Sequence, residues 1–213
     1  KKNFALRERK KQEKIRNKFM TNGVTLVAPD TIFLSKNTKI GKNVVIDPYV
    51  VIGAKVNIGN NVKIFSFSHL ESSKIENDVN IGPYARLRPG TILQKGSRVG
   101  NFVEIIKSKI VKNSKVSHLS YIRYTNIGDF VNKVASTITC NYDGANKHKT
   151  IIGNNVFIGS GGELVAPITV ENGATVGAGS TLSKKAPENK LTIERAKQKT
   201  IDGWQRPTKK KGK

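Results

Sequence analysis

The strongest constraint on the fold is an aliphatic residue that recurs every six positions. The run begins at Ile40, Ile46 and Ile52, slips by one residue at a few places, is interrupted over residues 139–151 and ends at Leu182. A period of six matches neither the 3.6 residues of an α-helical turn nor the two of a simple strand. It is the period of a β-helix, in which each hexapeptide makes one short strand and one corner. We therefore expect an all-β solenoid, a left-handed parallel β-helix of hexapeptide repeats.

The composition fits such a solenoid. Three hexapeptides close a triangular coil of about 18 residues, so roughly eight coils stack from about residue 27 to residue 185. A hydrophobic fraction of 37% suffices, because one aliphatic side chain in six fills a thin prism. No apolar run approaches the roughly 20 residues of a membrane span, and residues 1–6 lack the apolar stretch of a signal peptide. Cys140 is the only cysteine, which excludes an intramolecular disulfide and favours a reducing, cytoplasmic location.

The two ends of the chain carry much of its net charge of +23. Residues 1–22 hold nine Lys and Arg against two Glu, and residues 196–213 hold seven against one Asp, which gives +7 and +6. Basic ends indicate either binding to an anionic partner or a composition that keeps the chain soluble. No aromatic side chains alternate with these lysines to stack on bases, so we do not expect nucleic acid as the partner. Residues 5–20 lack Gly and Pro and predict an α-helix. We divide the chain into a helical linker arm (1–24), a β-helix domain (25–190) and a basic tail (191–213).

The six-residue frame also predicts which outward side chains stack in columns along the solenoid. His118 has Asn101 one coil below it and Ala135 one coil above, and the column continues beyond the interruption to Ser160 and Ala178. A lone exposed histidine in a solenoid is usually an ordinary surface residue. Here the small residues above it predict a groove with a titratable imidazole at one end, and histidine is a suitable general base near neutral pH.

Two further columns carry charge. One stacks Arg88, Ile106 and Arg123, and an arginine offers a forked set of donors for phosphate, although a solvated surface arginine is the simpler interpretation. The other places Glu104 between Arg86 and Tyr121, where Glu104 either pairs with Arg86 or orients the site.

The interruption at residues 139–149 predicts a polar loop that leaves the prism, with a turn at Asp143. We expect Cys140 to be a packed side chain and not a nucleophile. No His or Cys pair has metal-ligand spacing, so we expect no metal site.

Several motifs narrow the family. They are YARLRPG (84–90), VGNFVE (99–104), HLSY (118–121), TITCNYDGANK (137–147), VFIGS (156–160), LVAP (164–167) and GWQRP (203–207). In this order they resemble the C-terminal half of the bacterial bifunctional N-acetylglucosamine-1-phosphate uridyltransferase/glucosamine-1-phosphate N-acetyltransferase. The resemblance spans residues 1–213. The uridyltransferase domain is absent from this chain, and with it the Mg²⁺ that this domain is expected to bind.

The resemblance implies roles for individual residues. His118 matches the general base. Side chains expected to contact the amino-sugar phosphate are Arg88, Tyr121, Asn132 and, from a neighbouring subunit of a homotrimer, Lys147. Residues expected to contact the cosubstrate acetyl-CoA are Ala135, Asn141, Tyr142, Ser160, Ala178 and Arg195.

The sequence departs from the family beside this site. Ile106 stands where the family has a phosphate-binding Lys, and Arg123 stands where it has Gly, so we expect Arg123 to supply the missing charge. Lys133, Val134 and Ser136 replace Ile, Gly and Gly. Lys133 falls at an inward position, which is costly unless its amine escapes or is paired.

We expect acetyl transfer from acetyl-CoA to the amine of glucosamine 1-phosphate, a step toward UDP-N-acetylglucosamine and the cell wall, in a cytoplasmic homotrimer without membrane contact. The alternative is a non-catalytic trimeric scaffold that binds a sugar nucleotide or a protein partner. A solenoid that binds nucleic acid through its basic ends is the third possibility.

Overall fold

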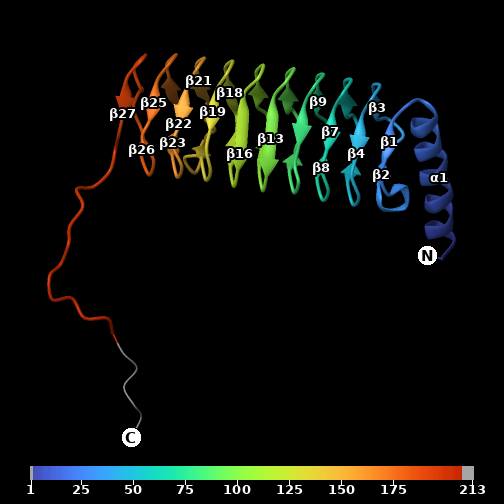
Figure 1. Cartoon of the computed structure of the whole chain (residues 1–213), viewed down its shortest axis with the longest axis horizontal. Helices are drawn as coiled ribbons and strands as arrows, with labels where there is room; N and C mark the ends of the chain where they lie inside the picture. The colour runs from blue at the N-terminus through green and yellow to red at the C-terminus, as the bar shows by residue number, and fades with distance from the viewer. Residues whose placement is uncertain (1, 208–213) are drawn as a thin grey trace, which may run out of the picture.

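The structure, a computed structural model, describes residues 2–207 and forms a straight β-solenoid (Figure 1). Helix α1 (Lys2–Thr21) lies across one end, and the segment after the last strand leaves the other end as an extended tail. Residue 1 and residues 208–213, which belong to the predicted arm and tail, lie outside the described residues. No helix among the described residues is long and apolar enough to cross a membrane.

Within residues 2–207 the solenoid has three parallel sheets of ten, nine and eight strands. The ten-stranded sheet contains β1 (Thr25–Leu26), β4 (Val45–Ile46), β7 (Lys63–Ile64), β10 (Asn80–Ile81), β13 (Arg98–Asn101), β16 (Lys115–His118), β19 (Asn132–Lys133), β22 (Phe157–Ile158), β25 (Thr175–Val176) and β27 (Leu191–Thr192). The nine-stranded sheet contains β2 (Phe33–Leu34), β5 (Val51–Ile52), β8 (His69–Leu70), β11 (Arg86–Leu87), β14 (Glu104–Ile106), β17 (Tyr121–Arg123), β20 (Ile138–Cys140), β23 (Glu163–Val165) and β26 (Thr181–Leu182). The eight-stranded sheet contains β3 (Lys39–Ile40), β6 (Asn57–Ile58), β9 (Lys74–Ile75), β12 (Ile92–Leu93), β15 (Lys109–Ile110), β18 (Thr125–Ile127), β21 (Thr150–Ile152) and β24 (Ile168–Val170).

These strands follow the six-residue frame. Ile46, Ile64 and Ile81 are register partners in successive strands of one sheet, and all three are buried. The predicted left-handed β-helix with an N-terminal helix is confirmed. It has about nine turns and extends from Thr25 to Thr192, slightly further than the eight coils expected. The difference arises at the ends, where strand pairing continues although the aliphatic repeat has stopped.

One corner of the prism, between the ten- and nine-stranded sheets, is called the His118 corner because His118 lies on it. Along its N-terminal half the aromatic rings of Tyr49, Phe67, Tyr84 and Phe102 stack on one another, with centroids 4.8 to 5.1 Å apart. This spacing is the strand separation of the sheets, so the ring ladder follows from stacking the coils in register.

Helix α1 covers the open edge of the first coil. The side chain of Gln12 donates a hydrogen bond to the carbonyl of Leu34 at 3.0 Å and accepts one from the N–H of Leu34 at 2.9 Å. Arg16 donates to the carbonyl of Ile32 and pairs with Asp30 at 3.0 Å. The helix thereby satisfies backbone groups of an edge strand that would otherwise be free to pair with another chain.

Lys133 is the one lysine that the described core contains. It is 0% exposed, between the inward Val116 and Ile158 of the adjacent coils, and its Nζ has no hydrogen-bond partner. The sequence predicted this inward position, and the amine neither escapes to the surface nor finds a carboxylate. Burial lowers the pKa of Lys133 to about 7.

The first prediction concerns the cost of this lysine. In the unfolded chain its pKa is the ordinary 10.5, so the folded state loses stability as the pH falls from 10.5 to about 7, and the loss is constant below that. We expect Lys133→Met to raise the melting temperature at pH 7 by about 5 to 10 °C, and the gain to shrink toward pH 10. Differential scanning calorimetry across this pH range measures the effect.

The matched control is Lys115→Met, because Lys115 is an exposed lysine on the preceding strand of the same sheet. We expect it to leave the melting temperature within about 1 °C of the parent. Equal melting temperatures for the two variants at pH 7 would show that Lys133 has no desolvation cost.

Candidate functional site

His118 is the last residue of β16 and lies exposed at the His118 corner, directly opposite Asn101 of β13. Its Nδ1 forms a short hydrogen bond with the side-chain oxygen of Asn101. An amide oxygen can only accept a hydrogen bond, so Nδ1 is the donor in this contact, and in the neutral imidazole the lone pair is then on Nε2. The imidazole is therefore held in the tautomer that a general base needs.

The imidazole lines a groove of about 430 Å³ that runs from His118 toward the N-terminal end of the ten-stranded sheet. Its floor includes Gly100, where a Cβ would overlap the carbonyl oxygen of Ser117 in the next coil, so coil packing requires glycine there. Three side chains that border the groove, Phe65, Asn80 and Arg98, were not among the residues predicted from the sequence. Their positions beside the glycines of one column were the available signal.

The predicted column of small residues is present above His118, but none of its members lines the groove, which lies on the N-terminal side of His118. The N–H of Gly161 donates to the carbonyl of Ala135 at 2.9 Å, and that of Gly179 donates to Ser160 at 2.8 Å. These bonds place Ala135, Ser160 and Ala178 in successive turns of the His118 corner. Arg195 follows the last strand and lies next to this column. Its Cδ is 3.8 Å from the position that a Cβ on Gly179 would take.

The outer face of the nine-stranded sheet carries the predicted phosphate contacts. Arg88 pairs with Glu104 at 2.8 Å, so the first of the two roles considered for Glu104, an ion pair with Arg86, is wrong. Arg86 lies directly opposite Glu104 in the register, but the longer diagonal reach from Arg88 gives the ion pair. Arg123 donates to the hydroxyl of Tyr121 at 3.3 Å and is half-buried.

In the column that holds Arg88 and Arg123, the position between these two arginines is apolar. Ile106, the register partner of Arg123, is 7% exposed and leaves an apolar gap between Arg88 and Arg123. Asn132 lies on a different face, as an exposed residue of β19 in the ten-stranded sheet.

The polar loop leaves the prism between β20 and β21, at the corner between the nine- and eight-stranded sheets, which we call the loop corner. Tyr142 is 59% exposed and Lys147 is also exposed, whereas Asn141 is only 4% exposed and its Nδ2 has no partner among the described residues. The predicted contacts of acetyl-CoA are thus divided between two corners of one prism.

Cys140 begins this loop and is half-buried. Burial and the nearby Glu163 raise the pKa of its thiol, so the thiol stays protonated near neutral pH. Among the described residues no group of three or more His, Cys, Asp or Glu side chains is placed to hold a metal ion.

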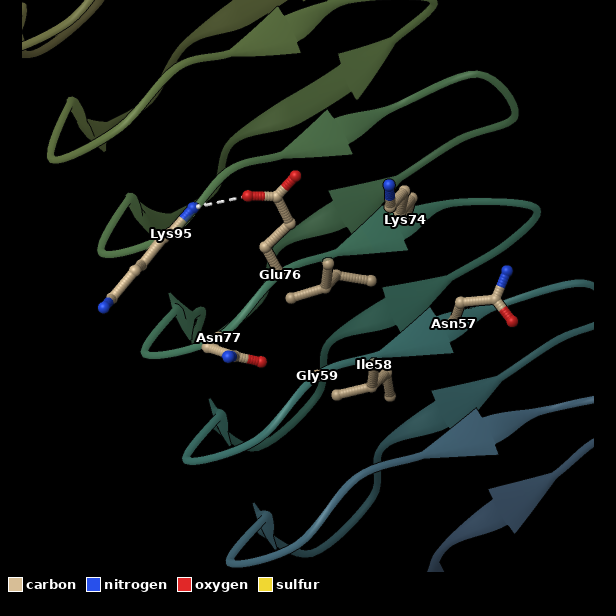
Figure 2. A pocket seen from close by; sticks show the side chains of 8 residues that line it. Asn57, Ile58, Gly59, Lys74, Glu76, Asn77 and Lys95 are labelled. Carbon is tan, nitrogen blue, oxygen red and sulfur yellow. Dashed lines mark hydrogen bonds between the residues drawn. The ribbon is translucent and has the colours of Figure 1, made fainter.

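A second hollow lies on the side of the eight-stranded sheet and is lined by residues such as Asn57, Lys74 and Asn77. Figure 2 shows it with the hydrogen bond from the N–H of Lys95 to the carboxylate of Glu76, 3.2 Å long. None of the predicted site residues lines this hollow.

Comparison with known proteins gives the family. Residues 37–70 match the bacterial transferase hexapeptide family (six repeats), and residues 149–184 match the hexapeptide repeat of succinyl-transferase. The "Bifunctional protein GlmU" of Cupriavidus pinatubonensis is 46% identical over 220 residues, which cover 95% of this chain and 48% of the relative. That of Aromatoleum aromaticum is 47% identical over 221 residues, 96% of this chain and 49% of the relative. The chain spans about half the length of the curated relatives it matches.

Solved structures show the same fold. The Arabidopsis UDP-N-acetylglucosamine acyltransferase has a TM-score of 0.59 at 17% identity, over 76% of this chain and 69% of that chain. The enzyme from Campylobacter jejuni has a TM-score of 0.57 at 14% identity, over 80% and 71%. At these identities the likeness concerns the fold alone. The sequence matches, which cover nearly the whole chain, show that it corresponds to the C-terminal half of the bifunctional GlmU proteins.

Proposed function

We propose that the chain transfers an acetyl group from acetyl-CoA to the amine of glucosamine 1-phosphate, giving N-acetylglucosamine 1-phosphate for the synthesis of UDP-N-acetylglucosamine. The observation that carries this proposal is the imidazole of His118, whose Nδ1 is bound to Asn101 while Nε2 stays free at the start of a column of small residues. The relatives named bifunctional GlmU proteins support it.

In the proposed mechanism both substrates are bound together, so no covalent acyl-enzyme forms. Nε2 of His118 takes a proton from the substrate amine as the amine attacks the thioester carbonyl, and the proton then passes to the departing CoA thiolate. The oxyanion of the tetrahedral intermediate needs a hydrogen-bond donor. The backbone N–H groups of Ala135 and Ser160 are suitable, because neither donates to a protein acceptor among the described residues.

The phosphate of the acceptor is assigned to the outer face of the nine-stranded sheet. Arg88 donates one N–H to Glu104 and keeps further donors of its guanidinium for phosphate. Arg123 supplies the second cation, and its bond to the hydroxyl of Tyr121 keeps it over the sheet. Asn132 contributes from the ten-stranded sheet.

We also propose a homotrimer with sites between subunits. Ala135, Ser160, Ala178 and Arg195 follow the His118 corner, whereas the loop with Asn141, Tyr142 and Lys147 starts at the loop corner. The two sets of residues can contact the same acetyl-CoA and the same acceptor if the loop of a neighbouring subunit reaches the His118 corner. Three subunits around a three-fold axis form a closed assembly in which every subunit makes this contact. We further propose that the enzyme is cytoplasmic and that Mg²⁺ serves only a uridyltransferase half. An arm (1–24) and a tail (191–213) flank the β-helix domain (25–190), and the first two residues of this tail, Leu191 and Thr192, still pair with the β-helix as strand β27.

The alternative function is a non-catalytic trimeric scaffold that binds a sugar nucleotide or a protein partner. One observation favours it. The buried, unpaired Lys133 lies two residues from Ala135, a proposed acetyl-CoA contact. The coil that carries both residues is less stable than it would be with an aliphatic residue at position 133.

The second prediction separates these functions. With acetyl-CoA and glucosamine 1-phosphate we expect release of free thiol, and we expect His118→Ala to slow it about 100-fold or more without lowering the melting temperature. Asn101→Leu removes the bond that fixes the tautomer and lowers kcat about ten-fold. His69→Ala, at a half-buried histidine of the nine-stranded sheet, is the control and keeps full activity. No thiol release from the parent chain favours the scaffold.

The third prediction tests the phosphate contact. We expect Arg123→Gly to raise the KM for glucosamine 1-phosphate about ten-fold while the KM for acetyl-CoA stays unchanged, because one charge-assisted contact is lost. Adding Ile106→Lys to this variant places a cation on the adjacent strand and restores the KM. Steady-state kinetics with each substrate varied in turn measures both, and an unaltered KM in Arg123→Gly rules out the contact.

The fourth prediction concerns the assembly. Light scattering of the chain at micromolar concentration should give about three times the monomer mass of 23.4 kDa. A monomer with full acetyltransferase activity would contradict the intersubunit site, because its loop and its His118 corner would then have to act within one chain.

A further inference from the structure

The polar loop after β20 is a small hairpin that is held together by its own hydrogen bonds. The backbone N–H of His148 donates to the carbonyl of Asn141 at 2.8 Å, and that of Asp143 donates to Asn146 at 3.2 Å. Tyr142 and Lys147 face each other as an isolated antiparallel bridge. Residues 142–147 are all exposed, so packing against the solenoid does not determine the shape of the loop.

Asp143 is the centre of this hairpin, because both of its carboxylate oxygens are used. Oδ1 accepts the backbone N–H groups of Ala145 and Asn146 at 2.8 and 2.6 Å. Oδ2 lies 2.6 Å from Nε2 of His148, across the base of the loop. The bonds from Asn146, His148 and Ala145 hold the pKa of Asp143 far below its usual range, so the carboxylate is ionised and can accept all three.

The hydrogen bonds that Asp143 accepts from the loop, which we call the brace, hold residues that the proposed function uses. Tyr142 directly precedes Asp143, and its hydroxyl donates to the carbonyl of Gly144 at 2.5 Å, while Lys147 directly precedes His148. An exposed loop of this length without such bonds would have to be ordered on each binding event, which weakens binding. The contact between Asp143 and His148 joins the residue after Tyr142 to the residue after Lys147. It therefore holds these two parts of the loop together.

We propose that Asp143 and His148 are positioning residues, which hold the loop in the shape in which Tyr142 and Lys147 meet the substrates. The proposal rests on the proposed acetyltransferase function. Neither side chain takes part in the chemical step. Their effect is on substrate binding, because the bound loop has the same shape in any variant and only the cost of ordering it changes.

The test uses the full chain and four variants. His148→Leu and Asp143→Ala remove the brace, and we expect each to raise the KM for acetyl-CoA about ten-fold with kcat within about two-fold of the parent. His148→Gln keeps a neutral nitrogen donor toward Oδ2 and restores most of the affinity. The matched control is His69→Leu, because His69 pairs with Glu71 at 3.4 Å on the nine-stranded sheet, away from the loop.

Hydrogen exchange provides a readout that does not depend on activity. The amide protons of Ala145 and Asn146 should exchange faster in His148→Leu and Asp143→Ala, while the melting temperature stays that of the parent. If the parent chain releases no thiol, the proposed function fails and hydrogen exchange alone decides whether the brace exists. Unchanged exchange, a KM in His148→Leu equal to that in His69→Leu, a loss confined to kcat, or no recovery in His148→Gln would each overturn the positioning role.

Discussion

The parallel pairing of each coil with the coils before and after it is the constraint on which this structure depends. Strands of only two to four residues are held on both edges, and their inward aliphatic side chains stack along one thin core. Since every coil repeats the same path, an outward side chain also lies directly above its counterpart one coil earlier. Any site on the surface is therefore assembled from columns, and residues 17, 18 or 25 positions apart become neighbours.

This stacking restricts where the chain can vary. Coil-to-coil approach leaves no room for a Cβ at positions such as Gly100, whereas the corners accept rings as large as those of Tyr49 and Phe102 at positive φ. Insertions also fit only at corners, and the loop after β20 is such an insertion. The side chains of the proposed site accordingly lie at two corners and on the face between them. His118 is at the His118 corner, the hairpin with Asp143 is at the loop corner, and Arg88 and Arg123 are on the outer face of the nine-stranded sheet.

The coil that carries Lys133 combines two opposite demands. Its outward side carries Ala135, one of the proposed acetyl-CoA contacts, while its inward side places an amine in the apolar core without a partner. The neighbouring coils pack aliphatic side chains above and below, so the fold tolerates the lysine because cooperative strand pairing continues across it. The cost is local and is expressed as a lowered pKa of the amine.

The sequence alone determined the solenoid, the inward residues including Lys133, and the column from Asn101 through His118 to Ala178, because a fixed period of six converts positions in the chain into positions in space. It also showed that a polar loop interrupts the repeat. Only the tertiary structure decided which side chains pair: Glu104 with Arg88 and not with Arg86, Arg123 with the hydroxyl of Tyr121, and His148 with Asp143. The same holds for the side chains that border the groove beside His118. The period fixes where each Cβ lies. The rotamer and reach of a long side chain depend instead on its neighbours in the same and adjacent coils, and those of the loop residues depend on an irregular backbone path, which the repeat does not encode.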